Sequence, residues 1–415
     1  MNLTDLLKNY KNSELSRFHT PGHSGKAAVL SDFSQVLPFD VTEVLEFDSI
    51  YHADSCIKNI EQKAAKLFGA KRSVISVGGC TLAIQTMLAL ACDKNAKIAA
   101  GRNAHVSFIN TCALLDLDPM WIYPKDGRVM SNDVEKALEE GAKVVYITSP
   151  DYFGRLSDIE KIADLCHEKG AVLLVDNAHG PHLKFLETDL HPLSLGADMT
   201  ACSLHKTLPV LTGGAVLNIN NDKFVEKAKE KMALFGSTSP SYLILASIES
   251  CFDYLETKPN FLEERVLALK KYAKENGAKM PQGECDPMRL TLAVDEKEAL
   301  KNGAVADYSD GEYTVFITTP FHDETDFARL KAVIDTARGS AVQSTKITAP
   351  KRGLRLQEAY FAQSEEIAAS AAIGRIAAQS VSICPPGIPL IIPGEIIDED
   401  IIKQMQNKVI KVVKQ

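Results

Sequence analysis

The sequence lacks three features that would place it in a specialised class of protein. Its nine cysteines form no Cys-x-x-Cys pair, which argues against a zinc site or a disulfide framework and favours a reducing compartment. No run approaches the roughly 20 consecutive apolar residues that a membrane span requires, and the amphipathic N-terminus lacks the apolar core of a signal peptide. The sequence also contains no internal repeat. We therefore expect a cytoplasmic protein without a metal site or a membrane anchor.

An excess of positive charge is also missing. The 415 residues carry a formal net charge of −8, with a sequence pI near 5.8. An acidic surface does not attract nucleic acid or anionic membrane, so neither is expected as a main partner, whereas a small basic ligand remains compatible. With 45% hydrophobic and 24% charged residues, the chain can bury a large core and is expected to form two domains.

Strand-like and helix-like segments alternate through the first half of the chain. Apolar runs of strand length indicate strands buried on both faces, and the amphipathic segments between them indicate helices. This alternation predicts an α/β fold with a mostly parallel sheet covered by helices. The expected strands span 73–77, 97–100, 120–123, 144–148, 172–176 and 215–219, and the expected helices span 57–68, 82–92, 132–140, 158–168, 222–234 and 241–255.

The segment Lys258-Pro259-Asn260 is the predicted domain junction. We expect an N-terminal arm and loop at 1–50, a large domain at 51–257 and a smaller α+β domain at 258–415. The small domain is predicted to contain strands at 288–294, 304–308 and 313–318, helices at 323–336 and 357–379, and an extended Pro-rich run at 384–395.

A lysine motif at 203–209, Ser-Leu-His-Lys-Thr-Leu-Pro, is placed by its sequence context at the end of a predicted strand. The hydroxyl of Ser203 and the imidazole of His205 can hydrogen-bond a phosphate, and the amine of Lys206 can bond covalently to an aldehyde. These are the groups needed to hold a phosphate-bearing aldehyde. The alternative is a solvated or ion-paired lysine.

A second motif follows the apolar run 172–175 and reads Asp-Asn-Ala-His-Gly. Ligands of parallel sheets bind at the carboxyl ends of the strands. There, Asp176 can pair with a protonated ring nitrogen, and Ala178 leaves room for a flat ring. The alternative is that Asp176 caps a helix or turn.

A glycine-rich turn at 78–81, Gly-Gly-Cys-Thr, joins a predicted strand to a predicted helix. Backbone N–H groups at a helix N-terminus and the helix dipole together favour an anion. Gly79, Cys80 and Thr81 are therefore candidates for binding a phosphate.

The lysine and aspartate motifs resemble those of the ornithine/lysine/arginine decarboxylase family of fold-type I pyridoxal-phosphate enzymes. Further motifs follow in the family's order: Phe-His-Thr-Pro-Gly-His at 18–23, Asp-Val-Thr-Glu at 40–43, Arg-Asn-Ala-His at 102–105, Thr-Ser-Pro at 148–150, Ser-Thr-Ser-Pro-Ser-Tyr at 237–242, Asp-Pro at 286–287 and Pro-Pro-Gly-Ile-Pro at 385–389. The resemblance covers nearly the whole chain. It implies an aspartate aminotransferase-like large domain, pyridoxal 5'-phosphate as cofactor, and decarboxylation of arginine, lysine or ornithine in polyamine biosynthesis.

The same resemblance assigns roles to individual residues. His105 would stack on the cofactor ring, although a helix-capping or core histidine is the alternative. Thr238 and Ser239 would reach the phosphate of a partner subunit, so a homodimer with shared active sites is expected; an ordinary helix cap is the alternative there. Lys206, His205 or His179 can return a proton to the α-carbon. The family's larger members have an additional N-terminal domain, for which this chain has no room.

Several positions depart from the family pattern: Asn177 stands for Glu, Val106 for Lys, Gly213 for Gln, Cys384 for Tyr, Gly78 for Asn and Cys80 for Ser. The same cofactor site serves other reactions on this fold, so an aminotransferase or another lyase remains an alternative. A protein that binds the cofactor with lost or altered catalysis is a further one. An acidic cluster, Asp40, Glu43, Glu46, Asp48 and Asp54, can hold a distal amine or guanidinium, or can be solvated surface.

Overall fold

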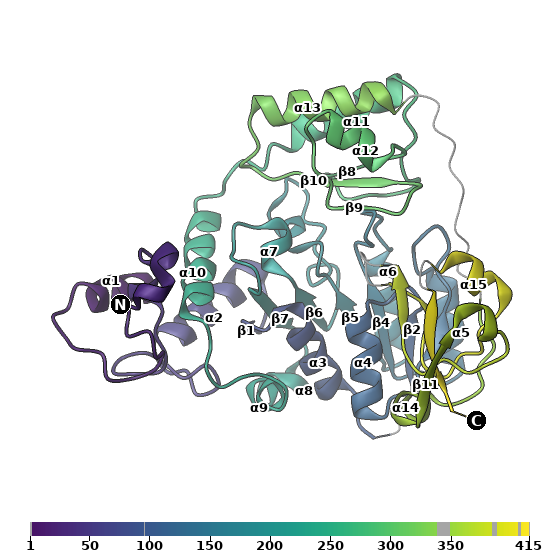
Figure 1. Cartoon of the computed structure of the whole chain (residues 1–415), viewed down its shortest axis with the longest axis horizontal. Coiled ribbons are helices and arrows are strands. Elements are labelled where there is room, and N and C mark those ends of the chain that lie inside the picture. The colour runs from purple at the N-terminus through teal and green to yellow at the C-terminus, as the bar shows by residue number, and fades with distance from the viewer. Residues whose placement is uncertain (1, 95, 338–348, 384–387, 406–407, 415) are drawn as a thin grey trace. The chain divides into compact units, whose positions relative to one another are not determined.

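The computed structural model describes residues 2–94, 96–337, 349–383, 388–405 and 408–414 (Figure 1). The chain forms two compact units, each built from two stretches of sequence. Unit 1 comprises residues 1–90 and 180–259, and unit 2 comprises residues 91–179 and 260–415. The domain boundaries expected from the sequence stay a prediction.

Unit 1 contains an antiparallel set of strands in which β7 pairs with both β1 and β6. The strands are β1 (Arg72–Ser76), β6 (Met199–Cys202) and β7 (Ala215–Ile219). Every residue of β7 is buried, as expected for a strand with neighbours on both edges. The helices of this unit are α1 (Leu3–Lys11), α2 (Cys56–Phe68), α3 (Gly79–Ala91), α7 (Leu204–Thr207), α8 (Asp222–Val225), α9 (Ala228–Ala233) and α10 (Tyr242–Glu256), with 3-10 turns η1 (Ala28–Phe33), η2 (Leu37–Phe39) and η3 (Pro181–Phe185).

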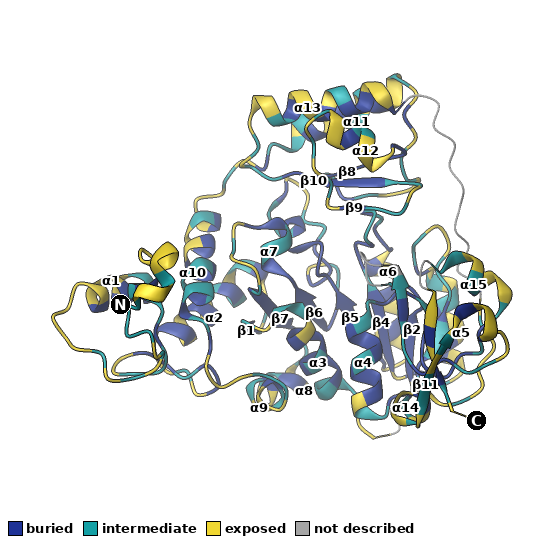
Figure 2. Cartoon of the chain, viewed as in Figure 1, coloured by how far each residue is buried: buried dark blue, intermediate teal, exposed yellow. Residues whose placement is uncertain are grey.

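Unit 2 contains the parallel part of the fold. Parallel pairings join β5 to β4, β4 to β2 and β2 to β3. The strands are β2 (Ile98–Gly101), β3 (Met120–Ile122), β4 (Val144–Thr148) and β5 (Val172–Asp176), and helices α4 (Val106–Leu115), α5 (Ser131–Glu139) and α6 (Ile159–Glu168) connect them. Figure 2 shows β4 and β5 in the buried colour, which fits their continuous aliphatic sequences. The βαβ alternation predicted from the sequence is confirmed here.

The expected α+β part begins after residue 260. Strand β10 (Thr314–Ile317) pairs antiparallel with β8 (Arg289–Leu292) and with β9 (Tyr308–Ser309). Helices α11 (Glu263–Glu275), α12 (Glu296–Lys301) and α13 (Glu324–Thr336) complete it. Helix α13 starts at a capping box in which Asp323 and Asp326 each accept a hydrogen bond from the other's backbone N–H group.

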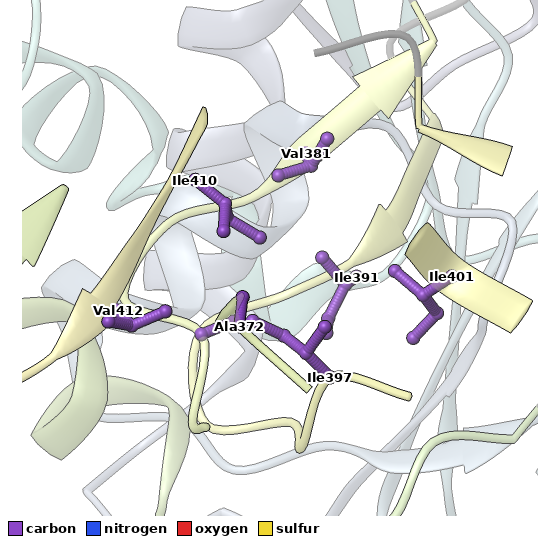
Figure 3. Close-up of a cluster of buried hydrophobic side chains, with 8 residues drawn as sticks. Ala372, Val381, Ile391, Ile397, Ile401, Ile410 and Val412 are labelled. Carbon is purple, nitrogen blue, oxygen red and sulfur yellow. The ribbon is translucent and has the colours of Figure 1, made fainter. Parts of the chain in front are cut away.

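The predicted helix 357–379 is wrong. Helix α14 (Leu356–Phe361) ends early, and β11 (Ser364–Ala368) pairs antiparallel with β14 (Val409–Val413), placing Ile367 opposite Ile410. The rest of this region comprises η4 (Ala369–Ala371), β12 (Val381–Ile383), β13 (Ile388–Ile391) and α15 (Glu399–Gln404). Ile410 and Val412 pack in a buried cluster with Ile391, Ile397 and Ile401 (Figure 3). Burial in that cluster outweighs the helix propensity of an Ala- and Glu-rich sequence.

Smaller differences concern element ends. The helix expected at 222–234 is divided into α8 and α9, and the strand expected at 304–308 is reduced to β9. Cys384 and residues 338–348 lie outside the described residues. Within the described part of the chain, none of the helices combines the length and apolar character needed to cross a lipid bilayer.

Candidate active site

Asp176 is the last residue of β5, at the carboxyl end of the parallel strands of unit 2. Its side chain is buried, and it accepts hydrogen bonds from the Tyr146 hydroxyl at 3.1 Å and from the Ala178 N–H at 3.1 Å. Tyr146 belongs to the neighbouring strand β4, two residues before Thr148, which pairs with Asp176. The carboxylate is therefore held in a fixed orientation at the strand end.

Asn177, a departure from the family's Glu, is fully buried beside Asp176. Its Nδ2 donates to the backbone oxygen of Ser149 at 2.8 Å, and the Ser149 N–H donates to the backbone oxygen of Asp176 at 3.1 Å. A carboxylate at position 177 would place an acceptor against this carbonyl acceptor. The amide therefore braces the ends of β4 and β5, which gives this departure a structural reason.

His105 precedes α4 and caps its N-terminus. Its Nδ1 accepts from the Ser107 N–H at 3.2 Å and lies 2.8 Å from the Ser107 Oγ. The capping alternative raised by the sequence is therefore observed. Because Nδ1 accepts from a backbone N–H, the neutral ring has its proton on Nε2. The cap also fixes the orientation of the ring, which stacking on a flat cofactor requires.

His179 and Ala178 follow Asp176 and are both buried. The ring of Tyr152 meets the His179 ring edge to face, with 4.6 Å between centroids. The guanidinium of Arg289, on β8, reaches the His179 backbone oxygen at 3.1 Å. The loops that follow β4 and β5 are thus held together by a side chain from a distant part of the sequence.

Lys206 lies in unit 1, in the short helix α7 that follows β6, rather than at the strand end itself. Ser203 is the N-cap position of α7 and is buried. The Nδ1 of His205 is 3.3 Å from the Ser203 Oγ, 3.2 Å from the Gly214 oxygen and 3.3 Å from the Gly213 N. The motif thus forms one folded turn that positions Ser203, His205 and Lys206 together.

Gly213, which stands for the family's Gln, has a φ of +103°. This left-handed region favours glycine. A Cβ at this position would also lie 3.2 Å from the Ile244 Cδ1 and 3.3 Å from the Val77 oxygen. The backbone conformation at position 213 therefore explains why this chain has Gly where the family has Gln.

The glycine-rich turn starts α3 at Gly79, which has a φ of +71°. The Gly79 N–H donates to the Gly213 oxygen at 2.9 Å, and the Ser76 Oγ donates to the Gly79 oxygen at 2.9 Å. The N–H groups in the first turn of a helix and the helix dipole favour an anion at this position. Cys80 is half-buried and Thr81 is exposed, and their role in binding a phosphate stays a prediction.

Thr238 and Ser239 are exposed in the single chain. The cap of α10 is Ser241, whose Oγ accepts from the Ile244 N–H at 3.4 Å. The helix-cap alternative therefore applies to Ser241, while Thr238 and Ser239 remain available to another molecule.

The predicted residues thus fall into two sets, one in each unit. Unit 1 holds Ser203, His205, Lys206 and the turn at 79–81, and unit 2 holds His105, Asp176, Ala178 and His179. Pyridoxal phosphate needs an amine that can bond to its aldehyde, N–H groups that can bind its phosphate, and a carboxylate that can pair with its ring nitrogen. Lys206, the turn at 79–81 and the buried Asp176 are groups of these three kinds. The residues present fit this cofactor.

Two residues of the acidic cluster, Asp48 and Asp40, have partners within the chain. Asp48 is buried and accepts from the Ser55 and Ile57 N–H groups at the start of α2. Asp40 pairs with His23 at 3.1 Å. Both residues thus have partners within the chain, and the role of the cluster in holding a distal amine stays a prediction.

Sequence reasoning missed Tyr146, Arg289 and the buried pair of Arg102 with Glu395. Tyr146 carries a hydroxyl within an otherwise aliphatic strand, and Arg289 follows the Asp-Pro motif; both signals were present. Nothing local connects Arg102 with Glu395, because 293 positions separate them.

Comparisons with known proteins show the family of the chain. The family model "Orn/Lys/Arg decarboxylase, major domain" matches residues 2–302, and the model of the family's C-terminal domain matches residues 344–411. An arginine decarboxylase of Bacillus subtilis is 29% identical over 443 aligned positions, covering 95% of this chain and 90% of that protein. The constitutive lysine decarboxylase of Escherichia coli is 24% identical, covering 65% of this chain and 43% of that protein.

Solved structures show the same fold. The lysine decarboxylase of Francisella novicida superposes with a TM-score of 0.80 at 17% identity, covering 99% of this chain and 81% of that chain. An aspartate aminotransferase of Thermus thermophilus gives a TM-score of 0.54 at 14% identity over 69% of this chain and 88% of that chain. The expected fold-type I architecture with a smaller α+β part is therefore confirmed. The chain belongs to the Orn/Lys/Arg decarboxylase family and is a pyridoxal-phosphate-dependent decarboxylase of a basic amino acid.

Proposed function

We propose that the substrate is arginine and that the products are agmatine and carbon dioxide. The observation that carries this choice is the whole-chain similarity to proteins named arginine decarboxylase. Those of Bacillus subtilis, Halalkalibacterium halodurans and Bacillus anthracis are 28–29% identical and cover 92–96% of this chain. The similarity to the Escherichia coli lysine decarboxylase covers 65%. Such a reaction would serve polyamine biosynthesis in the cytoplasm.

Bound pyridoxal phosphate supplies a protonated ring that accepts the electron pair left when the carboxylate departs. In this proposal the Lys206 amine holds the cofactor aldehyde, and Asp176 keeps the ring nitrogen protonated through a charge-assisted hydrogen bond. His105 would lie against the ring face, and Ala178 would leave room for the ring. The N–H groups of the 79–81 turn would bind the phosphate together with Ser203 and His205.

A proton must replace the lost carboxylate at the α-carbon. Lys206, His205 and His179 are the candidate donors, since all three side chains can carry a proton near neutral pH when their surroundings permit.

We also propose a homodimer with shared active sites, supported by apolar residues that the single chain leaves exposed in its N-terminal arm. Phe18 is 97% exposed and Val29 is 92% exposed, and Leu15, Phe33 and Leu45 are exposed as well. Apolar side chains gathered on one segment of a soluble protein commonly mark an interface. The exposed Thr238 and Ser239 would then complete the partner's phosphate site.

The substrate test is direct. Purified, cofactor-loaded protein is incubated separately with arginine, lysine and ornithine, and mass spectrometry follows the amine lighter by carbon dioxide. We expect agmatine from arginine, and a loss of about 10³-fold or more in Lys206→Ala. Lys223→Ala, which removes an exposed lysine of the same unit, is the matched control and should leave the rate unchanged.

Other products would change the assignment. Cadaverine or putrescine as the main amine would move the substrate to lysine or ornithine, and a keto acid would indicate an aminotransferase. If no amino acid is consumed while borohydride still fixes the cofactor on Lys206, the protein binds the cofactor without this catalysis.

The dimer has its own test. A variant lacking the Thr238 and Ser239 hydroxyls is mixed with Lys206→Ala under conditions of subunit exchange. Shared sites predict that activity reappears in the mixture, because one site of the mixed dimer then has both sets intact. Mixtures that remain as inactive as the separate variants would contradict shared sites.

A further inference from the structure

The guanidinium of Arg289 contacts both the backbone and the ring of His179. Its Nη2 donates to the His179 oxygen at 3.1 Å and lies 3.4 Å from the His179 Nδ1. Its Nη1 donates to the Tyr152 oxygen at 2.9 Å. Arg289 is 3% exposed, so water competes little for these hydrogen bonds.

The chemistry of the two groups fixes which nitrogen of His179 carries the proton. A guanidinium in a protein is always protonated and can only donate hydrogen bonds. The His179 Nδ1 that faces it must therefore accept. A neutral ring that accepts at Nδ1 carries its hydrogen on Nε2, and a second proton could enter only on the nitrogen that faces the cation.

We propose that Arg289 is a positioning residue that keeps His179 neutral with its hydrogen on Nε2, so that His179 acts as a hydrogen-bond donor and not as the acid that reprotonates the α-carbon. This inference rests on the proposed function. A neutral imidazole that lost its Nε2 proton would become a strongly basic imidazolate, and the imidazolium that could give up a proton is opposed by Arg289. Proton return is thereby left to Lys206 or His205.

The other charged and titratable groups around this site do not reverse the effect. From the loop after β4, Tyr152 packs on the His179 ring, and burial raises the pKa of its phenol, so it stays neutral. Asp307, the residue before β9, hydrogen-bonds Tyr152, and the ring of Tyr308 also meets the Tyr152 ring edge to face. Asp151 and Asp286 face Arg289 itself; Asp286 lies 3.8 Å from its Nε. Neither carboxylate is within hydrogen-bond distance of the Arg289 Nη2 that faces His179: the Asp286 contact is to Nε at 3.8 Å, and Asp151 hydrogen-bonds Arg155.

The tautomer can be measured without turnover. Holoenzyme labelled with ¹⁵N-histidine is examined by long-range ¹H–¹⁵N NMR from about pH 6 to about pH 8, with His179→Gln assigning the signal among the ten histidines. We expect an unprotonated Nδ1 and a protonated Nε2 at every pH. Arg289→Met should give mixed tautomers or protonation at the acid end, while Arg289→Lys, which keeps a cationic donor, should restore the wild-type pattern.

Thr291→Val is the matched control. Thr291 lies on the same strand as Arg289, and its Oγ1 donates to the Phe153 oxygen at 2.9 Å, so its loss loosens the same loop without touching His179. It should leave the His179 signals unchanged. If Thr291→Val shifts them as Arg289→Met does, or if Arg289→Met leaves them unchanged, Arg289 does not set the tautomer.

Activity then tests the consequence. Glutamine can donate a hydrogen bond but cannot act as a proton-returning acid, so His179→Gln should retain agmatine formation within about tenfold of wild type, whereas His179→Leu should fall about 10²-fold. A His179→Gln enzyme as inactive as Lys206→Ala would overturn the donor role. Absence of agmatine with the wild-type enzyme would contradict the proposed substrate and leave the NMR result standing.

Discussion

Two buried arginines in unit 2 stabilise loops at the carboxyl ends of its parallel strands, and they differ in how their charge is balanced. Arg102 follows β2 and forms a bidentate pair with Glu395, with Nε to Oε1 at 3.2 Å and Nη2 to Oε2 at 2.9 Å. Its Nη1 also donates to the Pro389 oxygen at 2.8 Å. Arg289 instead donates mainly to backbone carbonyls, and its nearest carboxylate, Asp286, is 3.8 Å away.

This difference separates a structural link from a group that acts on its neighbours. The Arg102 charge is matched by a carboxylate at hydrogen-bond distance, so the pair presents little net charge to its surroundings. Carbonyl dipoles solvate the Arg289 guanidinium without neutralising it, and its field therefore reaches His179 and Asp151. We expect Arg102 to matter for stability and Arg289 to matter for protonation states as well.

The largest expected effect follows from removing Arg102. Arg102→Met leaves the buried Glu395 without its cation, and we expect a loss of about 3–5 kcal/mol in the free energy of unfolding, measured by chemical denaturation. The double variant Arg102→Met, Glu395→Met should recover most of that loss, since it removes both charges. If the unfolding free energy of Arg102→Met is within about 1 kcal/mol of the wild-type value, this ion pair does not stabilise the segment before His105.

A pH effect distinguishes the surroundings of the two arginines. Burial raises the pKa of Asp151 from 3.8 to about 6, although Arg155 and Arg289 lower it. Since the folded-state pKa is above the unfolded one, the folded chain binds this proton more tightly. The stability that protonated Asp151 contributes is therefore fully present below about pH 4 and is lost as the pH rises through about 6. The difference between 6 and 3.8 corresponds to about 3 kcal/mol.

We expect the unfolding free energies of wild type and Asp151→Asn to diverge by about 3 kcal/mol between about pH 4 and about pH 7. Wild type should lose stability relative to the variant as the pH rises. Arg289→Met should move the divergence to a higher pH, and Arg102→Met should not move it. A constant difference between wild type and Asp151→Asn would show that Asp151 is ionised across this range.

A smaller effect is expected at Asn177, which braces the same strand ends through a neutral amide. Asn177→Asp keeps the shape but replaces the donor to the Ser149 carbonyl with a charged acceptor next to Asp176. We expect a loss of about 1–3 kcal/mol in unfolding free energy and weaker retention of pyridoxal phosphate during dialysis. Asn177→Gln keeps a donor and serves as the comparison; equal losses in both variants would indicate a packing effect rather than the amide hydrogen bond.

The sequence predicted those parts of the molecule that local patterns determine. Apolar runs located β4 and β5, and the run that ends in Asp176 placed this residue at a strand end, whereas Lys206, also expected at a strand end, lies in the short helix α7. The contacts of the two arginines join segments far apart in the chain, and no periodicity or motif records which partners meet. The wrong helix at 357–379 has the same cause, because β11 forms only through its pairing with β14. Local propensity is a weak guide where a distant strand decides the conformation.

The smallest effect tests whether the Arg289 loop is stabilised by several side chains or by Arg289 alone. Thr291→Val removes one neutral hydrogen bond to the Phe153 oxygen and leaves a methyl group of similar shape, so we expect a loss of only about 1 kcal/mol by chemical denaturation. Its effect should add to that of Arg289→Lys, because the two side chains bond different carbonyls. If the double variant instead loses much more than the sum, the loop opens as one unit, and the position of His179 would then depend on β8 as a whole and not on a single guanidinium.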